Sequence, residues 1–308
     1  MKNKKHVMMQ PGSPKLSEVI GQFLASKASQ SRSAYLLTLR YTLGRLTHEL
    51  GDPPVNAVTT GQLSQAIFAS GATPRSRRQK LALIKTFFTW SRANCYLPPH
   101  LPSPADPIRI VVPAIEPAIL TPAELKTLLA GTQDVEVRLR IALSAFAGLR
   151  LYELEGLDWN RVDPRATIWV DRGPSMTRRC RLIPIQPVLH AWLEPFCGCR
   201  GRVLPAKRSK WKLRQWARRL GVPLKPNVFR HSYGTYRYVL TMDLVRTSME
   251  MGLNATLLAP RFLTRITREQ ALEYFSLTPE AVGIKDWPQR VAKYLKRRQA
   301  LPPTARTR

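Results

Sequence analysis

Two arginines in apolar surroundings are the residues best suited to chemistry in this sequence. Arg150 follows the apolar run Ala-Phe-Ala-Gly-Leu, and Arg230 follows Asn-Val-Phe. A guanidinium in such surroundings is costly unless it is paired. Two of them converging on one phosphate would form a bidentate clamp and stabilise a pentacoordinate transition state. The alternative for Arg150 is a structural ion pair with Glu153 or Glu155.

Other catalytic patterns are absent from the sequence. It contains no phosphate-binding glycine loop, no HExxH and no G-x-S-x-G. Acidic residues are few, and no pair of them is spaced to hold Mg²⁺. Cys197 and Cys199 flank a glycine, but no second Cys/His pair at zinc spacing follows them. We therefore expect no metal, no cofactor and no small-molecule substrate.

The charge balance predicts an anionic partner. The 308 residues include 49 Lys and Arg against 20 Asp and Glu, a net charge of +29. Self-repulsion of this size opposes compaction, which favours nucleic acid as the partner. No segment has the roughly 20 apolar residues that span a bilayer, and the basic N-terminus lacks the apolar core of a secretory signal. We expect a cytoplasmic, bacterial-type, nucleoid-associated protein that binds double-stranded DNA and no membrane.

The first hundred residues predict a compact helical unit. Apolar residues recur at helical spacing, and the predicted helices cover residues 16–27, 33–50, a stretch from residue 60, and 75–93. The fourth helix follows Pro74 and opens with cations, which oppose the helix dipole at that end. We interpret these cations as phosphate contacts, with a solvated face as the alternative; they are Arg75, Arg77, Arg78 and Lys80.

Proline marks the domain boundary. Seven prolines fall between residues 97 and 117, and proline at this density prevents continuous helix and favours an extended linker. The expected parts are a basic tail at 1–14, a helical DNA-binding domain at 15–97, a linker at 98–118, a second domain at 119–284, and a basic helix or tail at 285–308.

The second domain is predicted to be mainly helical with one small β-hairpin. Two β-like runs, 167–171 and 181–185, flank a polar turn, and the predicted helices include 135–147, 228–239, 243–251, 255–263 and 268–275. A basic helix is expected over 207–220. Its cations are a second set of candidate DNA contacts, again with a solvated face as the alternative; they are Lys207, Arg208, Lys210, Lys212 and Arg214. The basic C-terminal tail is a further candidate.

Several motifs resemble those of the tyrosine recombinases, or phage-type integrases. Gly148–Trp159 is similar to the signature that opens their catalytic domain. Arg181–Ile185 resembles the second strand of their β-hairpin, and Phe229–Tyr236 their second arginine motif. The helical unit before the prolines is similar to their core-binding, SAM-like domain. The resemblance covers roughly residues 15–280 and implies a role in DNA recombination or integration, typical of mobile elements.

The family's reaction uses six groups, and the resemblance assigns a position to each. Two arginines and a His or Trp hold the scissile phosphate, a hairpin lysine is the general acid, a histidine assists proton transfer, and a tyrosine attacks phosphorus. The retained positions are Arg150 and Arg230. The substituted positions are Met176 or Thr177 for the lysine, Asn227 and Leu253 for the two histidines, and Phe262 for the tyrosine.

These substitutions predict a protein that binds DNA without cleaving it. Phenylalanine has no oxygen to attack phosphorus, and neither leucine nor asparagine can shuttle a proton. Arg178 and Arg179 lie near the lysine position and are candidate DNA contacts, but arginine is a poor general acid because it stays protonated. His231 is expected to support the site.

The resemblance leaves several roles open. The chain could act with copies of itself, or as an inert partner of an active recombinase in a synaptic multimer. One alternative is an active recombinase with a displaced nucleophile such as Tyr274. Another, from a different class, is an RNA-binding protein that uses the same positive charge.

Overall fold

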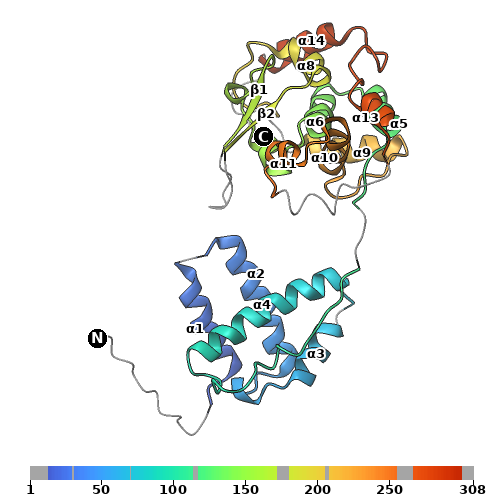
Figure 1. The fold of residues 1–308 in the computed structure, drawn as a ribbon. Helices are drawn as coiled ribbons and strands as arrows, with labels where there is room; N and C mark the ends of the chain where they lie inside the picture. The colour runs from blue at the N-terminus through green and yellow to red at the C-terminus, as the bar shows by residue number, and fades with distance from the viewer. Residues whose placement is uncertain are drawn as a thin grey trace. The chain divides into compact units, whose positions relative to one another are not determined.

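A computed structural model divides the chain into two compact units, residues 1–115 and residues 116–308 (Figure 1). It describes residues 13–29, 31–69, 71–113, 117–171, 180–204, 208–254 and 266–299. Within these ranges, no helix combines the length and the apolar character needed to cross a membrane.

The first unit is a set of helices around one apolar core. The helices are α1 (Leu16–Ala28), α2 (Ser33–Leu50), α3 (Thr60–Phe68) and α4 (Pro74–Ala93), with a short turn η1 (Val55–Ala57) before α3. Apolar residues three and four apart face inward, as Leu39, Leu43 and Leu46 do on α2. The Thr73 side chain accepts a hydrogen bond from the Ser76 backbone N–H and so caps α4. The expected helical unit is thus present.

The proline-rich segment contributes to the core of this first unit. Leu97, Ala105 and Ile108 are buried among the helices. Lys85 Nζ on α4 donates to the carbonyl of Ile108 at 3.3 Å. The expected linker is therefore shorter than its proline content indicates, because the segment up to about residue 110 packs on α4 instead of bridging the units.

The second unit packs helices around α6 (Val135–Phe146), which is buried over most of its surface. α6 contacts α5, α7, α8, α9, α10 and α14. The elements around it are α5 (Pro122–Gly131), α7 (Leu151–Gly156), η2 (Trp159–Arg161), α8 (Pro187–Leu193), η3 (Glu194–Phe196), α9 (Arg208–Arg219), α10 (Val228–Thr241), α11 (Leu244–Met251), α13 (Arg268–Tyr274) and α14 (Trp287–Gln299). The helix predicted over 255–263 lies outside the described residues.

A two-stranded antiparallel hairpin completes the second unit. It consists of β1 (Thr167–Val170) and β2 (Arg181–Pro184). Ile168 pairs with Ile183, and both face the core. Side chains alternate along a strand, so Arg181 points to the same side as Ile183, towards α11. The predicted fold, mainly helical with a small hairpin, is confirmed.

Helix α14 is an integral part of the second unit. Trp287 and Val291 are buried in its core, and Trp287 Nε1 donates to the carbonyl of Trp192 at 3.1 Å. The C-terminal region had been expected as a basic helix or tail beside the domain. Its cations do lie on the outside, but its apolar side closes the core.

Candidate functional site at the end of helix α11

Three arginines from separate parts of the second unit meet at the C-terminal end of α11. Arg150 immediately precedes α7, Arg181 opens β2, and Arg230 lies in the first turn of α10. The backbone that leads into Arg150 requires glycine at position 148. Gly148 has φ +57°, and a Cβ there would lie 2.3 Å from the ring of Tyr233, so no larger residue fits.

Three successive backbone carbonyls at this helix end each accept a hydrogen bond from one of the arginines. The pairs are Glu250 with Arg181, Met251 with Arg230, and Gly252 with Arg150. The last carbonyls of a helix lack partners within the helix and carry the negative end of its dipole. The end of α11 therefore both satisfies and orients the three guanidinium groups.

One carboxylate, that of Glu153, is shared by two of these arginines. Its oxygens lie 2.9 Å from Arg150 Nη1 and 2.9 and 2.7 Å from Arg181 Nη1 and Nη2. Burial raises the pKa of Glu153, but the hydrogen bonds and charges of Arg181 and Arg150 outweigh it and lower the pKa to about 2. Glu153 is thus a fixed anion that holds both guanidinium groups in place.

Glu153→Gln is expected to destabilise the second unit in a pH-dependent way. Removing one partner of a buried ion pair costs about 3–5 kcal/mol. The folded pKa of about 2 lies below the ordinary value of 4.5, so the stabilisation is complete above about pH 4.5 and is lost as the pH falls towards 2. Urea unfolding of wild type and variant should differ most at pH 7 and less at pH 3. An equal difference at both values would contradict this role of Glu153.

Arg230 differs from its two neighbours because its partners are neutral. It donates to the carbonyls of Gly148 and Met251, and no carboxylate among the described residues forms an ion pair with it. Burial and the charge of Arg150 lower the pKa of Arg230 to about 9, so it remains a cation at neutral pH. Three guanidinium groups against the single carboxylate of Glu153 leave a surplus of two positive charges, which favours an anionic ligand.

Three other residues of the predicted site, Asn227, His231 and Leu253, are described by the structure. Asn227 is exposed and starts α10 in the left-handed conformation, φ +60°. His231 is half-buried on α10 directly after Arg230. The Leu253 side chain packs against Tyr233 and Met251, so this position contributes apolar packing where the family has a hydrogen-bonding side chain. The remaining predicted positions, Met176, Thr177, Arg178, Arg179 and Phe262, lie outside the described residues.

Tyr274 is poorly placed to serve as a displaced nucleophile. It is fully buried on α13, and its hydroxyl donates to the carbonyl of Ala145 at 3.0 Å. Its ring stacks on Tyr236 with centroids 4.2 Å apart, and burial raises its pKa well above the ordinary value. A nucleophile must reach the phosphate and lose its proton, so the structure disfavours this alternative.

Sequence reasoning missed two residues of the cluster, Arg181 and Glu250. Arg181 was read only as part of a strand. The signal that could have found it is the alternation of β2, which places a cation on the buried face with Ile183. For Glu250 the only local signal is Arg246, four residues earlier on the same helix; its closer partners, Tyr233 and Arg237, lie on another helix.

The cations of α4 divide into two groups. Arg75 and Arg78 are exposed. Arg77, by contrast, lies over the ring of Phe68 at 5.4 Å and donates to its carbonyl. Lys80 is 16% exposed and contacts Glu49 and the carbonyl of Ala66, both at 3.0 Å. Arg77 and Lys80 were expected to contact phosphate, but their side chains instead hold α4 against its neighbours.

The predicted cations of α9 are also only partly available at the surface. Lys212 Nζ pairs with Asp134 at the start of α6, Lys210 is half-buried, and Lys207 and the side chain of Arg208 lie outside the described residues. Among the described side chains of this helix, the exposed cations are Arg214, which is one of the candidate contacts, and Arg218 and Arg219; Trp211 is 61% exposed. The exposed positive charge described on α9 therefore lies mainly in its C-terminal half.

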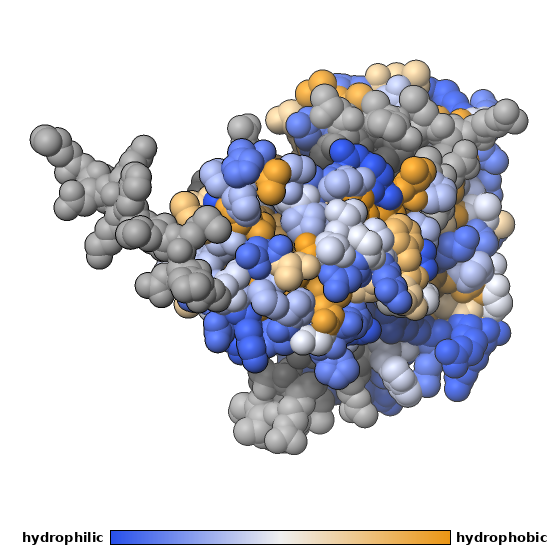
Figure 2. All heavy atoms as spheres, turned by 90° about the horizontal axis from the view of Figure 1, so that it is seen from below, coloured by the Kyte–Doolittle hydropathy of each residue, from blue (hydrophilic) through white to orange (hydrophobic). Residues whose placement is uncertain are grey.

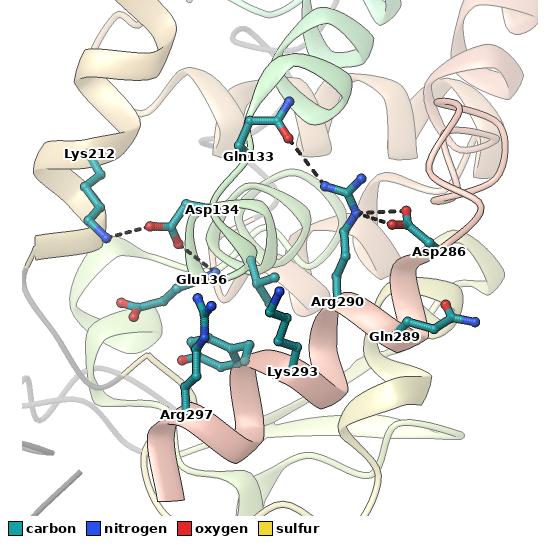
Figure 3. A pocket seen from close by; sticks show the side chains of 11 residues that line it. Gln133, Asp134, Glu136, Lys212, Asp286, Gln289, Arg290, Lys293 and Arg297 are labelled. Carbon is teal, nitrogen blue, oxygen red and sulfur yellow. Dashed lines mark hydrogen bonds and ion pairs between the residues drawn. The ribbon is translucent and has the colours of Figure 1, made fainter. Parts of the chain in front are cut away.

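Lys212 also borders a polar pocket of about 630 Å³ between α6, α9 and α14. Figure 3 shows two ion pairs among its charged side chains, Lys212 with Asp134 and Arg290 with Asp286. Across the part of the chain that the structure describes, no three potential metal ligands lie together. Four cations and three carboxylates line the pocket, so its surplus of one positive charge is smaller than the surplus of two at the arginine cluster.

The fold and the arginine cluster together resemble those of the tyrosine recombinases. Among solved structures, a λ integrase fragment crystallised as a dimer on a core-site DNA matches with a TM-score of 0.69 and 13% identity, over 82% of this chain and 98% of that one. The Tn1549 transposon integrase in complex with transposon right-end DNA matches with a TM-score of 0.67 and 15% identity, over 85% of this chain and 99% of that one. These similarities establish the fold.

Curated relatives agree with this class. Tyrosine recombinase XerC of Serratia marcescens is 26% identical over 289 residues, which is 84% of this chain and 93% of the relative. Tyrosine recombinase XerA of Pyrococcus horikoshii is 23% identical over 233 residues, or 70% and 78%. No protein-family model matches the sequence. The resemblance to the tyrosine recombinases drawn from the motifs is confirmed.

Proposed function

We propose that this chain is a tyrosine-recombinase-like protein that binds double-stranded DNA in recombination or integration and does not cut the DNA itself. The observation that supports this most is the arginine cluster at the end of α11. Arg150 and Arg230, the two positions retained from the family's phosphate-binding set, converge there with a surplus of positive charge. A phosphodiester supplies the anion that such a cluster favours.

The inert part of the proposal rests on the substituted positions. Phe262 offers no nucleophilic oxygen. Leu253 is used for packing, and Met176 cannot protonate a leaving group. The site would then grip a phosphate without supplying either the attacking group or the general acid.

The exposed face of α4 is the second support for a DNA partner. It presents two arginines, a glutamine and small residues, and α4 contains no acidic residue at all; the exposed set is Arg75, Arg78, Gln79, Ala82, Thr86 and Thr89. Arginine pairs with guanine, glutamine with adenine, and methyl groups contact thymine in the major groove. On the face drawn in Figure 2, hydrophilic residues predominate and hydrophobic residues form only small separate groups.

The salt dependence of DNA binding tests this proposal. For a duplex, log K should fall with log[salt] by about 0.9 for each phosphate neutralised. Replacing both Arg75 and Arg78 with alanine should reduce the slope by about 1.8, because each is exposed and free to contact a phosphate. Fluorescence anisotropy of a labelled duplex between 50 and 300 mM KCl is a suitable measurement.

Lys80→Ala is the matched control, because Lys80 lies on the same helix but pairs with Glu49. It should leave the slope unchanged and lower only the stability of the first unit. A wild-type slope near zero would exclude the DNA clamp, and a strong preference for structured RNA in competition would favour the RNA-binding alternative.

We also propose that the chain acts in a multimer, either with copies of itself or with an active recombinase. The support is analogy, since λ integrase structures of the same fold include a dimer on a core site and a tetramer on a Holliday junction. Analytical ultracentrifugation on duplex DNA would test it, and a monomer at all concentrations, with or without an active relative, would oppose it.

A further inference from the structure

Glu250 is a buried carboxylate that lies outside the phosphate-binding set but is surrounded by strong donors. It is 4% exposed on α11. From α10, Tyr233 Oη donates to it at 2.8 Å, and Arg237 donates through Nε and Nη2 at 2.9 and 2.8 Å. Arg246 adds a contact at 3.3 Å from within α11, and Arg237 Nη1 reaches on to Gln186. The network thus joins α11 to α10.

The network remains charged at neutral pH. Burial raises the pKa of Glu250, but hydrogen bonds and charge from Arg237 and Tyr233 outweigh burial and lower it. Burial also raises the pKa of Tyr233, so its hydroxyl stays protonated and continues to donate. A buried ion pair of this kind is weak evidence for stability, since well-packed apolar residues often serve equally well. The more informative property of this network is therefore its geometry.

The position of Glu250 in α11 links this network to the three arginines. Its side chain is anchored to α10, and its own carbonyl accepts from Arg181 Nε at 2.8 Å. The next two carbonyls, of Met251 and Gly252, accept from Arg230 and Arg150. The Glu250 side chain and the three carbonyl groups therefore belong to one helical turn. Any shift of that turn would move all three carbonyl oxygens together.

The other side of the same turn is also held tightly. Gly252 has φ +59°, and a Cβ there would lie 3.1 Å from Arg181 Nη1. The backbone N–H of Leu253 closes the turn on the carbonyl of Ser248 at 2.9 Å, and the Leu253 side chain packs against Tyr233. The turn is fixed by packing on one side and by the Glu250 network on the other.

We propose that Glu250 is a positioning residue for phosphate binding. By tying the last turn of α11 to α10, it fixes the three carbonyls that hold Arg150, Arg181 and Arg230 in the orientation needed to grip one phosphate. This inference rests on the proposed function of the arginine cluster as a phosphate site. Glu250, although remote in sequence from Arg150 and Arg181, would thus determine the orientation of all three arginines.

Inorganic phosphate is the probe for this proposal. The dissociation constant is measured from the rise in melting temperature with phosphate, at constant ionic strength, on the full chain. Glu250→Gln should fold, as judged by circular dichroism, and bind phosphate about tenfold more weakly, the lower end of what removing supporting groups costs a site. A purely structural role would lower the melting temperature without changing the dissociation constant.

Two tyrosines of α10 provide a matched pair. Tyr233→Phe removes one hydrogen bond to Glu250, whereas Tyr236→Phe removes an equally buried bond to the carbonyl of Leu120 at 2.9 Å. Only Tyr233→Phe should weaken phosphate binding, and this pair decides the question if Glu250→Gln does not fold.

The outcomes separate this inference from the proposed function. Wild-type phosphate affinity in both Glu250→Gln and Tyr233→Phe, or equal losses in the two tyrosine variants, would overturn the positioning role. If phosphate stabilises neither the wild type nor Arg230→Met, the phosphate site itself fails, and with it the support for DNA binding at the cluster.

Discussion

The purified chain is expected to form no covalent adduct with DNA, even on a substrate that traps one. Phe262 cannot form a phosphotyrosyl bond. Three of the described tyrosines do not replace it, because the hydroxyls of Tyr233, Tyr236 and Tyr274 are buried and bonded to Glu250, Leu120 and Ala145 respectively. A buried phenol that is already donating cannot reach a phosphate.

The experiment requires a DNA site, which selection of bound duplexes from a random library provides. A nicked suicide substrate built on that site is incubated with the chain and resolved under denaturing conditions, with an active recombinase on its own site as the positive control. A protein–DNA species resistant to denaturation would contradict the proposal, and mass spectrometry of that species would identify the nucleophile.

Phe262→Tyr is expected to recover little of this chemistry. Each missing electrostatic donor costs about 10²–10³ in rate, and Met176, Asn227 and Leu253 are also substituted. Restoring the nucleophile alone would leave the leaving group without an acid. Efficient cleavage by the single variant would show that the hairpin arginines or another group supply the proton.

Arg230→Met is expected to lose phosphate binding while leaving the stability of the fold unchanged or higher. The charged hydrogen bonds lost to a phosphate are worth about 1.5–3 kcal/mol, or roughly 10- to 150-fold in affinity. The free energy of unfolding is expected to stay the same or rise, because Arg230 is a half-buried cation beside Arg150 and has no carboxylate partner among the described residues.

The expected direction of this stability change follows from the pKa of Arg230. Burial lowers it from 12.5 to about 9, so the folded state holds its proton less strongly than the unfolded state does. A cation with a lowered folded pKa destabilises the fold at every pH below that value. At pH 7, removing it relieves this cost, against which stand the two carbonyls that lose a donor.

Arg237→Met on the same helix is the contrasting variant. Arg237 pairs with buried Glu250 at 2.8 Å, and removing one partner of such a pair costs about 3–5 kcal/mol. Thermal and urea unfolding should therefore separate the two variants by several kcal/mol, with Arg237→Met the less stable of the two. A large loss of stability in Arg230→Met would show that Arg230 is mainly structural.

The contrasting behaviour expected of these two arginines illustrates how the site is organised. One arginine is neutralised within the protein and holds two helices together. The other is left with neutral partners and a surplus charge, at a cost to stability. Such a cost is typical of functional positions, where groups are kept for a ligand and not for the fold.

The sequence by itself determined the helical units and the hairpin, and it supplied the motifs from which the positions of the catalytic set are predicted. These depend on local features: apolar spacing along α2 and α6, the proline and threonine that start α4, and motifs that surround Arg150 and Arg230 within a few residues. The absence of a nucleophile at position 262 is likewise a property of one residue, and no folding is needed to see it.

Only the tertiary structure decided which charges are free. Lys80 pairs with Glu49, 31 residues away, and Lys212 with Asp134, 78 residues away, so two cations expected to contact DNA are used within the fold. Arg181 and Glu250, 69 residues apart, meet at the end of α11. A charged side chain can be paired, buried or available, depending on neighbours that folding brings from distant parts of the chain. The local sequence does not identify these neighbours.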